Sequence, residues 1–211
     1  MDTTYFWRER WVTIFRRRHI DPKKRKNLYR CFVKNETNQV YRDGIKFLEN
    51  KWRKVIWIVC DWRQWLLWWF GDIPTQFCIY HFKQVIRRYL TRNPKLQQNI
   101  DLKAIADDIW KWKYDSMMWL LSSWHTDNKK RLAEKNDNGW YMHERARKAY
   151  RSLKKKMYRA YTYEREWALL LPKTNNSLES INSHLKTKIR IHRWMKRERK
   201  QKFIRYYLYI S

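Results

Sequence analysis

Three carboxylates stand where α/β proteins often place catalytic groups. Asp2 lies in a segment rich in β-branched and aromatic residues, which predicts a strand. Asp61 ends the apolar run 54–61, which predicts a short buried strand, and Glu179 falls in the first turn of a predicted helix. Ligands bind open α/β sheets beyond the carboxyl ends of their strands. Carboxylates gathered there repel one another unless divalent cations neutralise them, and two Mg²⁺ ions held by such a trio activate an attacking oxygen and stabilise the leaving oxygen of a phosphodiester.

Each of the three acids also has a purely structural interpretation. Asp61 fits the end of a strand and the cap of the helix that follows it. Glu179 fits the third position of a capping box in which Asn176 is the N-cap. Asp2 fits an exposed acid near a chain end. The spacing of the residues alone leaves the metal-binding and the structural interpretations open.

The chain is strongly basic, since 49 Lys and Arg stand against 20 Asp and Glu and give a net charge of +29. Such a charge destabilises a compact chain by self-repulsion unless a polyanion neutralises it. Any single basic cluster is equally well explained as solvated surface, but the whole set predicts a nucleic-acid partner bound through its backbone. The candidate DNA-binding residues are Arg16, Arg17, Arg18, Lys23, Lys24, Arg25, Arg190, Arg193, Lys196 and Arg197.

The cysteines and the apolar runs indicate a cytoplasmic protein. Cys31, Cys60 and Cys78 are odd in number and form no Cys-x-x-Cys pair, which argues against a disulfide framework. Asp61 and Arg63 interrupt the most apolar stretch, so no run reaches the length of a membrane-spanning helix, and no signal peptide opens the chain. We therefore expect no membrane partner.

The order of the expected elements predicts an α/β core that is interrupted by an all-α insertion. Two strands over 2–15, a third over 28–37 and a helix over 38–52 come first. Two short strands and a helix are expected over 54–61, 76–81 and 82–91, and only helices over 95–165. We expect three regions: a first part of the core at 1–94, a helical insertion at 95–168, and the rest of the core with a basic helical tail at 169–211.

Four motifs, in order, resemble those of mutator-type DDE transposases of bacterial insertion sequences. They are "DTTYF" at 2–6, "IVCD" at 58–61, "CIYH" at 78–81 and "TNNSLESINSHLK" at 174–186. In that family the first aspartate opens a D-x-TYF motif, the second ends a strand before a glycine-containing turn, a C-x-x-H pair follows, and a glutamate lies in a TTN-x-LE helix start. The resemblance runs through the whole chain and includes the basic stretch "RIHRWMKRERKQKFI" near its end.

The resemblance implies an RNase H-like mixed sheet with flanking helices and an all-α insertion between the second aspartate and the glutamate. Asp2, Asp61 and Glu179 would be the catalytic triad and would hold two Mg²⁺ ions, for which Mn²⁺ would substitute. The activity implied is metal-dependent DNA cleavage at the ends of an insertion sequence, followed by strand transfer to target DNA. The partners implied are transposon ends, target DNA and further copies of the chain, in the bacterial cytoplasm at the nucleoid.

The resemblance also gives roles to residues beside the triad. Cys78 and His81 would be the C-x-x-H pair near the site; two ligands are too few for a zinc ion, so a structural or DNA-contacting role is expected. Asn175 and Asn176 would shape the start of the glutamate helix. Trp124 and other aromatic residues of the insertion either stack on an extruded base or form a helical core.

Two rival functions remain beside the transposase. One is an inactive transposase remnant that acts only as a basic nucleic-acid-binding protein. The other is an RNase H-like nuclease unconnected with transposition. A further expectation concerns the chain start: Asp2 directly follows Met1, so the strand that carries it lacks its upstream half, and we expect either a true start farther upstream or a remnant.

Tryptophan occupies positions where the resembled family has glycine. The chain has 3 glycines and 15 tryptophans, whereas glycine ordinarily makes up about 7% of residues. Some bacterial lineages read UGA as glycine, and our hypothesis is that a translation reading it as tryptophan produced this pattern; UGG codons at Trp62, Trp65 and Trp194 would overturn it. Trp110, Trp112, Trp119 and Trp124 stand in helical context and look like ordinary tryptophans. The positions expected to be glycine are Trp62 and those at or near Trp7, Trp11, Trp52, Trp57, Trp65 and Trp194.

Overall fold

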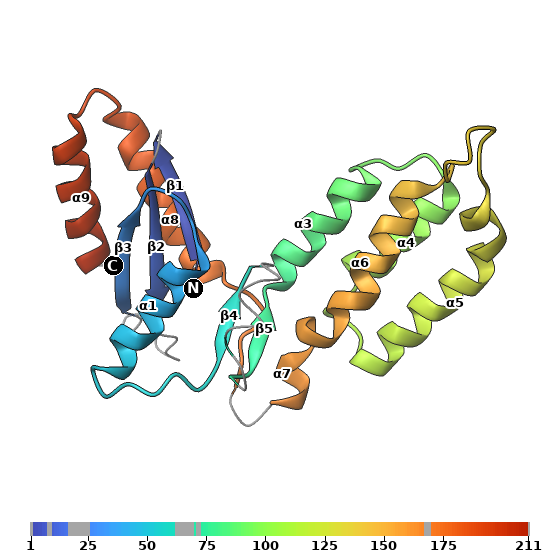
Figure 1. Cartoon of the computed structure of the whole chain (residues 1–211), viewed down its shortest axis with the longest axis horizontal. Helices are drawn as coiled ribbons and strands as arrows, with labels where there is room; N and C mark the ends of the chain where they lie inside the picture. The colour runs from blue at the N-terminus through green and yellow to red at the C-terminus, as the bar shows by residue number, and fades with distance from the viewer. Residues whose placement is uncertain are drawn as a thin grey trace. The chain divides into compact units, whose positions relative to one another are not determined.

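The chain is a mixed α/β protein in which helices predominate and the largest sheet has three strands. Its computed structural model describes residues 2–7, 10–16, 26–61, 70, 73–166 and 170–210 (Figure 1). The chain forms two compact units, a sheet-containing unit of Met1–Ile73 with Asn175–Ser211 and a helical unit of Pro74–Thr174. The helical unit therefore interrupts the first unit in sequence, and it begins earlier than the insertion expected from residue 95.

The sheet-containing unit is built on an antiparallel sheet of order β1-β2-β3. Its strands are β1 (Asp2–Trp7), β2 (Arg10–Arg16) and β3 (Asn27–Val33), which confirms the strands predicted in these regions. Asp2 lies opposite Ile14 in the register of β1 and β2. Helix α1 (Asn38–Glu49) packs against β3 and β2, α8 (Asn176–Ile191) against β1, and α9 (Arg197–Ile210) against β3 and α8.

Two sets of contacts place helices on both faces of this sheet. On one face, Ile14 of β2 is fully buried in a core with Leu178 and Leu185 of α8 and with residues of α9. On the other face, the Tyr29 ring of β3 lies 5.3 Å from the Phe47 ring of α1. Since successive side chains of a strand point to opposite faces, the sheet is the middle layer of three (Figure 1).

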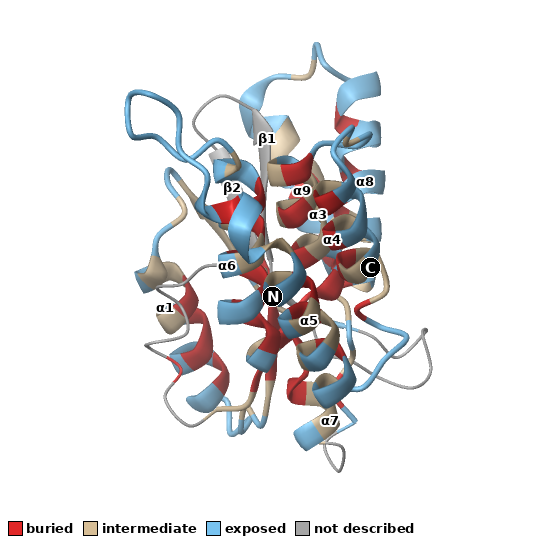
Figure 2. Ribbon diagram, turned by 90° about the vertical axis from the view of Figure 1, so that its right-hand side faces the viewer, coloured by how far each residue is buried: buried red, intermediate tan, exposed pale blue. Residues whose placement is uncertain are grey.

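The helical unit consists of one short strand, β5 (Thr75–Phe77), and five helices in its described residues. The helices predicted over 95–165 are confirmed, apart from an isolated bridge between Lys135 and Tyr141. Buried positions recur every three or four residues along the helices, which is the pattern of an amphipathic helix against a core (Figure 2). The helices are α3 (Ile79–Leu90), α4 (Gln97–Asp107), α5 (Tyr114–Ala133), α6 (Glu144–Ala160) and α7 (Thr162–Arg165).

Trp124 belongs to the core of the helical unit. Its side chain is only 4% exposed, and its Nε1 donates a hydrogen bond of 3.0 Å to the carbonyl oxygen of Gln98. Its ring also lies 5.7 Å from that of Tyr150. The core interpretation of this residue therefore holds, because a ring enclosed in this way cannot stack on a base.

Trp52 adopts a backbone conformation that favours glycine. Its φ is 58°, in the left-handed region, and its side chain is 98% exposed. The amide of Arg53 donates to the carbonyl of Leu48, and the amide of Trp52 donates to the carbonyl of Glu49. These two bonds form a Schellman motif, in which the left-handed residue after the helix is most often glycine. Trp194 is also exposed, but it is not among the described residues with positive φ.

Candidate functional site

The structure brings the backbone of Asp2 and the start of α8 to the same end of the sheet-containing unit. Helix α8 packs against β1. Both elements begin at the lower end of the β1-β2-β3 sheet in Figure 1, and the strand that opens with Asp2 packs against the helix that carries Glu179 in its first turn. The side chain of Asp2 lies outside the described residues.

The start of α8 differs from the predicted capping box. The N-cap is Asn175 and not Asn176, and its side chain makes no capping hydrogen bond. Glu179 is therefore the fourth helical residue and not the third. The backbone carbonyl of Asn175 instead accepts hydrogen bonds from the amides of Leu178, at 2.9 Å, and Glu179, at 3.3 Å. Asn175 is buried, Asn176 is exposed and Glu179 is half-buried. With the N-cap one residue earlier than predicted, Glu179 does not occupy the third helical position that a capping box requires.

Asp61 directly follows a buried strand, as predicted. This strand, β4 (Ile58–Cys60), is shorter than the predicted segment 54–61, and all three of its residues are buried. Asp61 itself is half-buried. Among the described residues β4 does not join the β1-β2-β3 sheet, so Asp2 and Asp61 do not share the edge of that sheet. The expected turn with Trp62 and Trp65 lies outside the described residues.

Cys78 and His81 are three residues apart and lie on the same side of the chain at the start of α3. Cys78 is the buried N-cap residue, and His81 is half-buried in the first turn. The Cys78 Sγ and a ring nitrogen of His81 lie within 4.8 Å of one another. The amide of Ile79 donates to the carbonyl of Lys173, which joins the helix start to the far end of the helical unit's sequence. This geometry fits a residue pair that fixes the start of α3.

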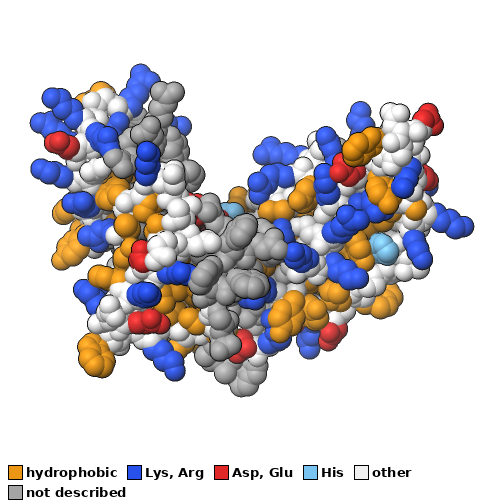
Figure 3. Space-filling model, in the orientation of Figure 1, with side chains coloured by type: hydrophobic (Ala, Val, Ile, Leu, Met, Phe, Trp, Pro, Cys, Tyr) orange, Lys and Arg blue, Asp and Glu red, His pale blue; other side chains and the backbone are white. Residues whose placement is uncertain are grey.

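The C-terminal basic residues form an accessible charged surface. Arg190 in the last turn of α8, Arg193 and Lys196 in the following turn, and Arg197 at the start of α9 are all exposed. None of them forms an ion pair with another residue in the described part of the chain. The other candidate DNA-binding side chains, those of Arg16–Arg18 and 23–25, lie outside the described residues. Lys and Arg side chains are scattered over the visible face of both units, among apolar and other side chains (Figure 3).

A second group of cations, on α3 and α4, was missed from the sequence. Arg87, Arg88, Arg92 and Lys103 line one pocket of the helical unit. They are spread over two helices and a loop, with mostly uncharged residues between them, so no basic run marks them. The only sequence signal is the adjacent pair Arg87–Arg88 in the last turn of a predicted helix.

The electrostatic surroundings of this group are positive. Burial, followed by the charges of Arg88 and Lys155, lowers the pKa of the Lys156 ammonium to about 8. Burial also lowers the pKa of Lys83, and the charge of Asp107 opposes that shift. The Lys83 ammonium contacts the carbonyl of Asp107 and lies 4.3 Å from the centre of the Trp110 ring.

Comparison of the chain with protein-family models, with curated proteins and with solved structures gave no significant match. In the part of the chain that the structure describes, no helix has the length and apolarity needed to cross a membrane.

Proposed function

We propose that the chain is the catalytic domain of a DDE transposase, which cleaves DNA at the ends of an insertion sequence and joins those ends to target DNA. One observation carries the proposal. Asp2 and Asp61 precede the helical unit in sequence and Glu179 follows it, yet all three belong to the same compact unit. A catalytic core interrupted before its glutamate by a helical insertion is what the four motifs imply.

The chemistry of the three acids fits the metal that the proposal requires. Carboxylate oxygens are the ligands that Mg²⁺ prefers, and the half-burial of Asp61 and Glu179 limits competition from bulk water. When bound, Mg²⁺ would activate the attacking oxygen and stabilise the leaving oxygen. The acids of the chain would orient the scissile phosphodiester, and the Arg and Lys side chains of α8 and α9 would hold its backbone.

The proposed reaction has two steps. In the first, the oxygen of water bonds to phosphorus at the transposon end, the bond from phosphorus to the 3′ oxygen breaks, and a 3′-hydroxyl is released. In the second, this hydroxyl forms a new bond to a phosphorus of target DNA as a backbone bond of the target breaks. We propose that copies of the chain act together on paired ends, in the bacterial cytoplasm at the nucleoid.

A supercoiled plasmid that carries the terminal repeats flanking the gene tests the proposal. With Mg²⁺ or Mn²⁺, the purified chain is expected to nick the plasmid at the repeats and to join the freed ends to a second DNA. Asp61→Asn and Glu179→Gln are each expected to abolish both products, whereas Asp137→Asn, on an exposed acid of the helical unit, is expected to leave them unchanged. Cleavage that survives both substitutions would contradict the proposal.

One observation favours a second candidate, a remnant that binds nucleic acid without catalysis. Because β4 lies outside the β1-β2-β3 sheet among the described residues, Asp61 lacks the shared sheet edge that would bring it to Asp2. The plasmid assay separates the two candidates. DNA binding without any metal-dependent cleavage would favour the remnant.

A further inference from the structure

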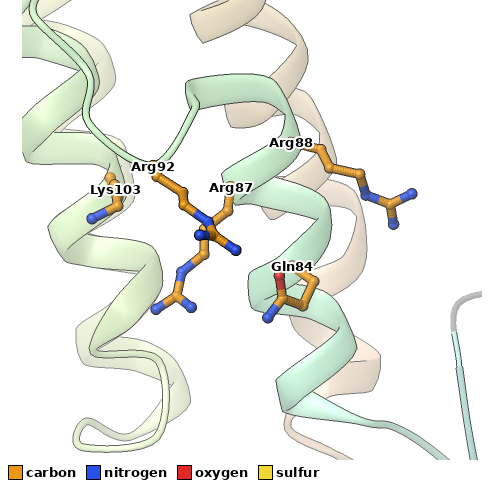
Figure 4. Close-up of a pocket in the computed structure, with 5 residues that line it drawn as sticks. All are labelled: Gln84, Arg87, Arg88, Arg92 and Lys103. Carbon is orange, nitrogen blue, oxygen red and sulfur yellow. The ribbon is translucent and has the colours of Figure 1, made fainter.

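An open pocket of about 490 Å³ on the helical unit is lined almost entirely by cations. Figure 4 shows that Gln84, Arg87 and Arg88 come from α3, Arg92 from the loop after it and Lys103 from α4. The guanidinium groups of Arg87 and Arg92 lie in the space between the two helices, whereas Arg88 extends from the other side of α3. A concave surface with several guanidinium groups matches the geometry of phosphate oxygens.

One carboxylate pairs with two members of this group. Asp107 accepts a hydrogen bond of 2.8 Å from Arg87 and lies 3.5 Å from the Lys103 ammonium. Arg88 and Arg92 form no ion pair with any other described residue, and both are exposed. The lining of the pocket therefore carries four positive charges, and Asp107, which pairs with Arg87 and Lys103, offsets one of them.

The end of α3 explains only part of this arrangement. Basic side chains in the last turn of a helix stabilise its dipole, which accounts for Arg87 and Arg88. It does not account for Arg92, which follows the helix, or for Lys103 on α4. Thr91, just before Arg92, has a φ of 69°, a conformation that costs a β-branched residue about 1–3 kcal/mol. The backbone is therefore strained at the residue that directly precedes Arg92.

A buried cation near Arg88 adds to the positive charge of this region. Lys156 of α6 is buried, and the charge of Arg88 disfavours its protonated form. No carboxylate contributes to the shift of its pKa. Like charges brought together in this way destabilise the free chain, and an anion bound at Arg88 would reduce the repulsion.

We propose that this pocket binds phosphate groups of a nucleic-acid backbone, as a second DNA contact separate from the basic residues of α8 and α9. The inference rests on the proposed function only in taking DNA as the polyanion. It does not require that the chain be catalytically active. Lys and Arg outnumber Asp and Glu about two to one within Pro74–Thr174, so the helical unit itself is suited to a polyanion.

The double variant Arg88→Gln/Arg92→Gln tests the inference in the full chain. Both side chains are exposed and without ion pairs to described residues, so the fold is expected to be retained, which thermal unfolding checks. The matched control is Arg145→Gln/Arg151→Gln, which removes the same charge from exposed positions of α6 in the same unit. Binding of a fluorescently labelled DNA duplex is measured by anisotropy as a function of salt concentration.

The pocket variant is expected to lose about tenfold to a hundredfold in affinity near 0.1 M salt, and its slope of log K against log salt is expected to become shallower by about 2, as for two lost phosphate contacts. The control is expected to change by less than threefold. Equal losses in both double variants would overturn the inference. The inference would also be overturned if the wild type bound inorganic phosphate in calorimetry while the wild type and the pocket variant bound DNA equally well. A free anion would then be the ligand of the pocket. Loss of plasmid cleavage alone would count against the proposed function and not against this pocket.

Discussion

Replacing Trp52 with glycine is expected to stabilise the chain by about 1 kcal/mol. A residue with a Cβ atom at a φ of 58° carries a cost of about 1–2 kcal/mol, which glycine avoids. The greater freedom of glycine in the unfolded chain costs about 0.4–1 kcal/mol in return. The indole is 98% exposed, so its removal forfeits almost no packing, and the net effect is positive.

Two further variants isolate the backbone effect. Trp52→Ala removes the indole but keeps the Cβ atom, so its stability is expected to stay within about 0.5 kcal/mol of the wild type. Trp194→Gly is the matched control, because Trp194 is 76% exposed and lacks positive φ. Glycine there relieves no strain, and the added freedom of the unfolded chain is expected to destabilise it by about 0.5–1 kcal/mol.

Urea unfolding followed by circular dichroism at 222 nm measures all four proteins. The midpoint of Trp52→Gly is expected above those of the wild type and of Trp52→Ala, with an unchanged dependence on urea. If Trp52→Gly is no more stable than Trp52→Ala, the backbone argument is refuted. The codon of residue 52 gives an independent check of the hypothesis that UGA was translated as tryptophan in place of glycine: UGA would identify a glycine position, and UGG a true tryptophan.

The remaining predictions concern buried polar groups of the helical unit. The pKa of Lys156 is lowered to about 8, so below pH 8 the full cost of its buried charge is present, and stability is expected to rise as pH increases from 8 to about 10.5. Lys156→Met is therefore expected to stabilise the chain by up to about 3 kcal/mol at pH 7 and to abolish the rise of stability with pH, as measured by urea unfolding at several pH values. The control Lys154→Met, at an exposed position, is expected to do neither. An unchanged pH dependence in Lys156→Met would contradict the reasoning. Gln76→Met is expected to lower the free energy of unfolding by about 2–4 kcal/mol. The side-chain Nε2 of Gln76 donates to the carbonyl of Ala160, at 2.6 Å, and its Oε1 accepts from the backbone amide of Tyr163, at 3.0 Å. A loss of stability no larger than that of the exposed control Gln97→Met would show that water replaces these bonds.

Long segments with a distinctive hydrophobic pattern or composition were predictable from the sequence. The pair of strands over 2–15 follows from its β-branched and aromatic residues, and the helices of 95–165 follow from helical spacing. The segment 76–81 was only partly right, since β5 ends at Phe77 and α3 begins at Ile79. A short apolar run does not distinguish strand from helix, and here the stripe that continues to Leu90 gives the helix the larger buried face.

The candidate site was predictable only where a local pattern marks it. Asp61 was placed correctly after a buried strand because apolar runs that end in a polar residue are visible in sequence. The N-cap of α8 was assigned one residue late, since two adjacent asparagines are equally good caps. The pocket of Arg88 and Arg92 could not be predicted at all, because it exists only once α3 and α4 have packed together.

Lys156 connects the stability of the helical unit with its proposed binding to DNA. Burial and the charge of the neighbouring Arg88 disfavour its protonated form, so we expect the free chain to be less stable than the same fold with an apolar residue at that position. A phosphate held by Arg88 would favour the protonated form of Lys156, and by linkage protonated Lys156 would favour the phosphate. Lys156→Met is therefore expected to stabilise the free chain and to weaken its DNA complex in the anisotropy assay. Tighter DNA binding by that variant would mean that the repulsion has no role in recognition and is only a cost of the fold.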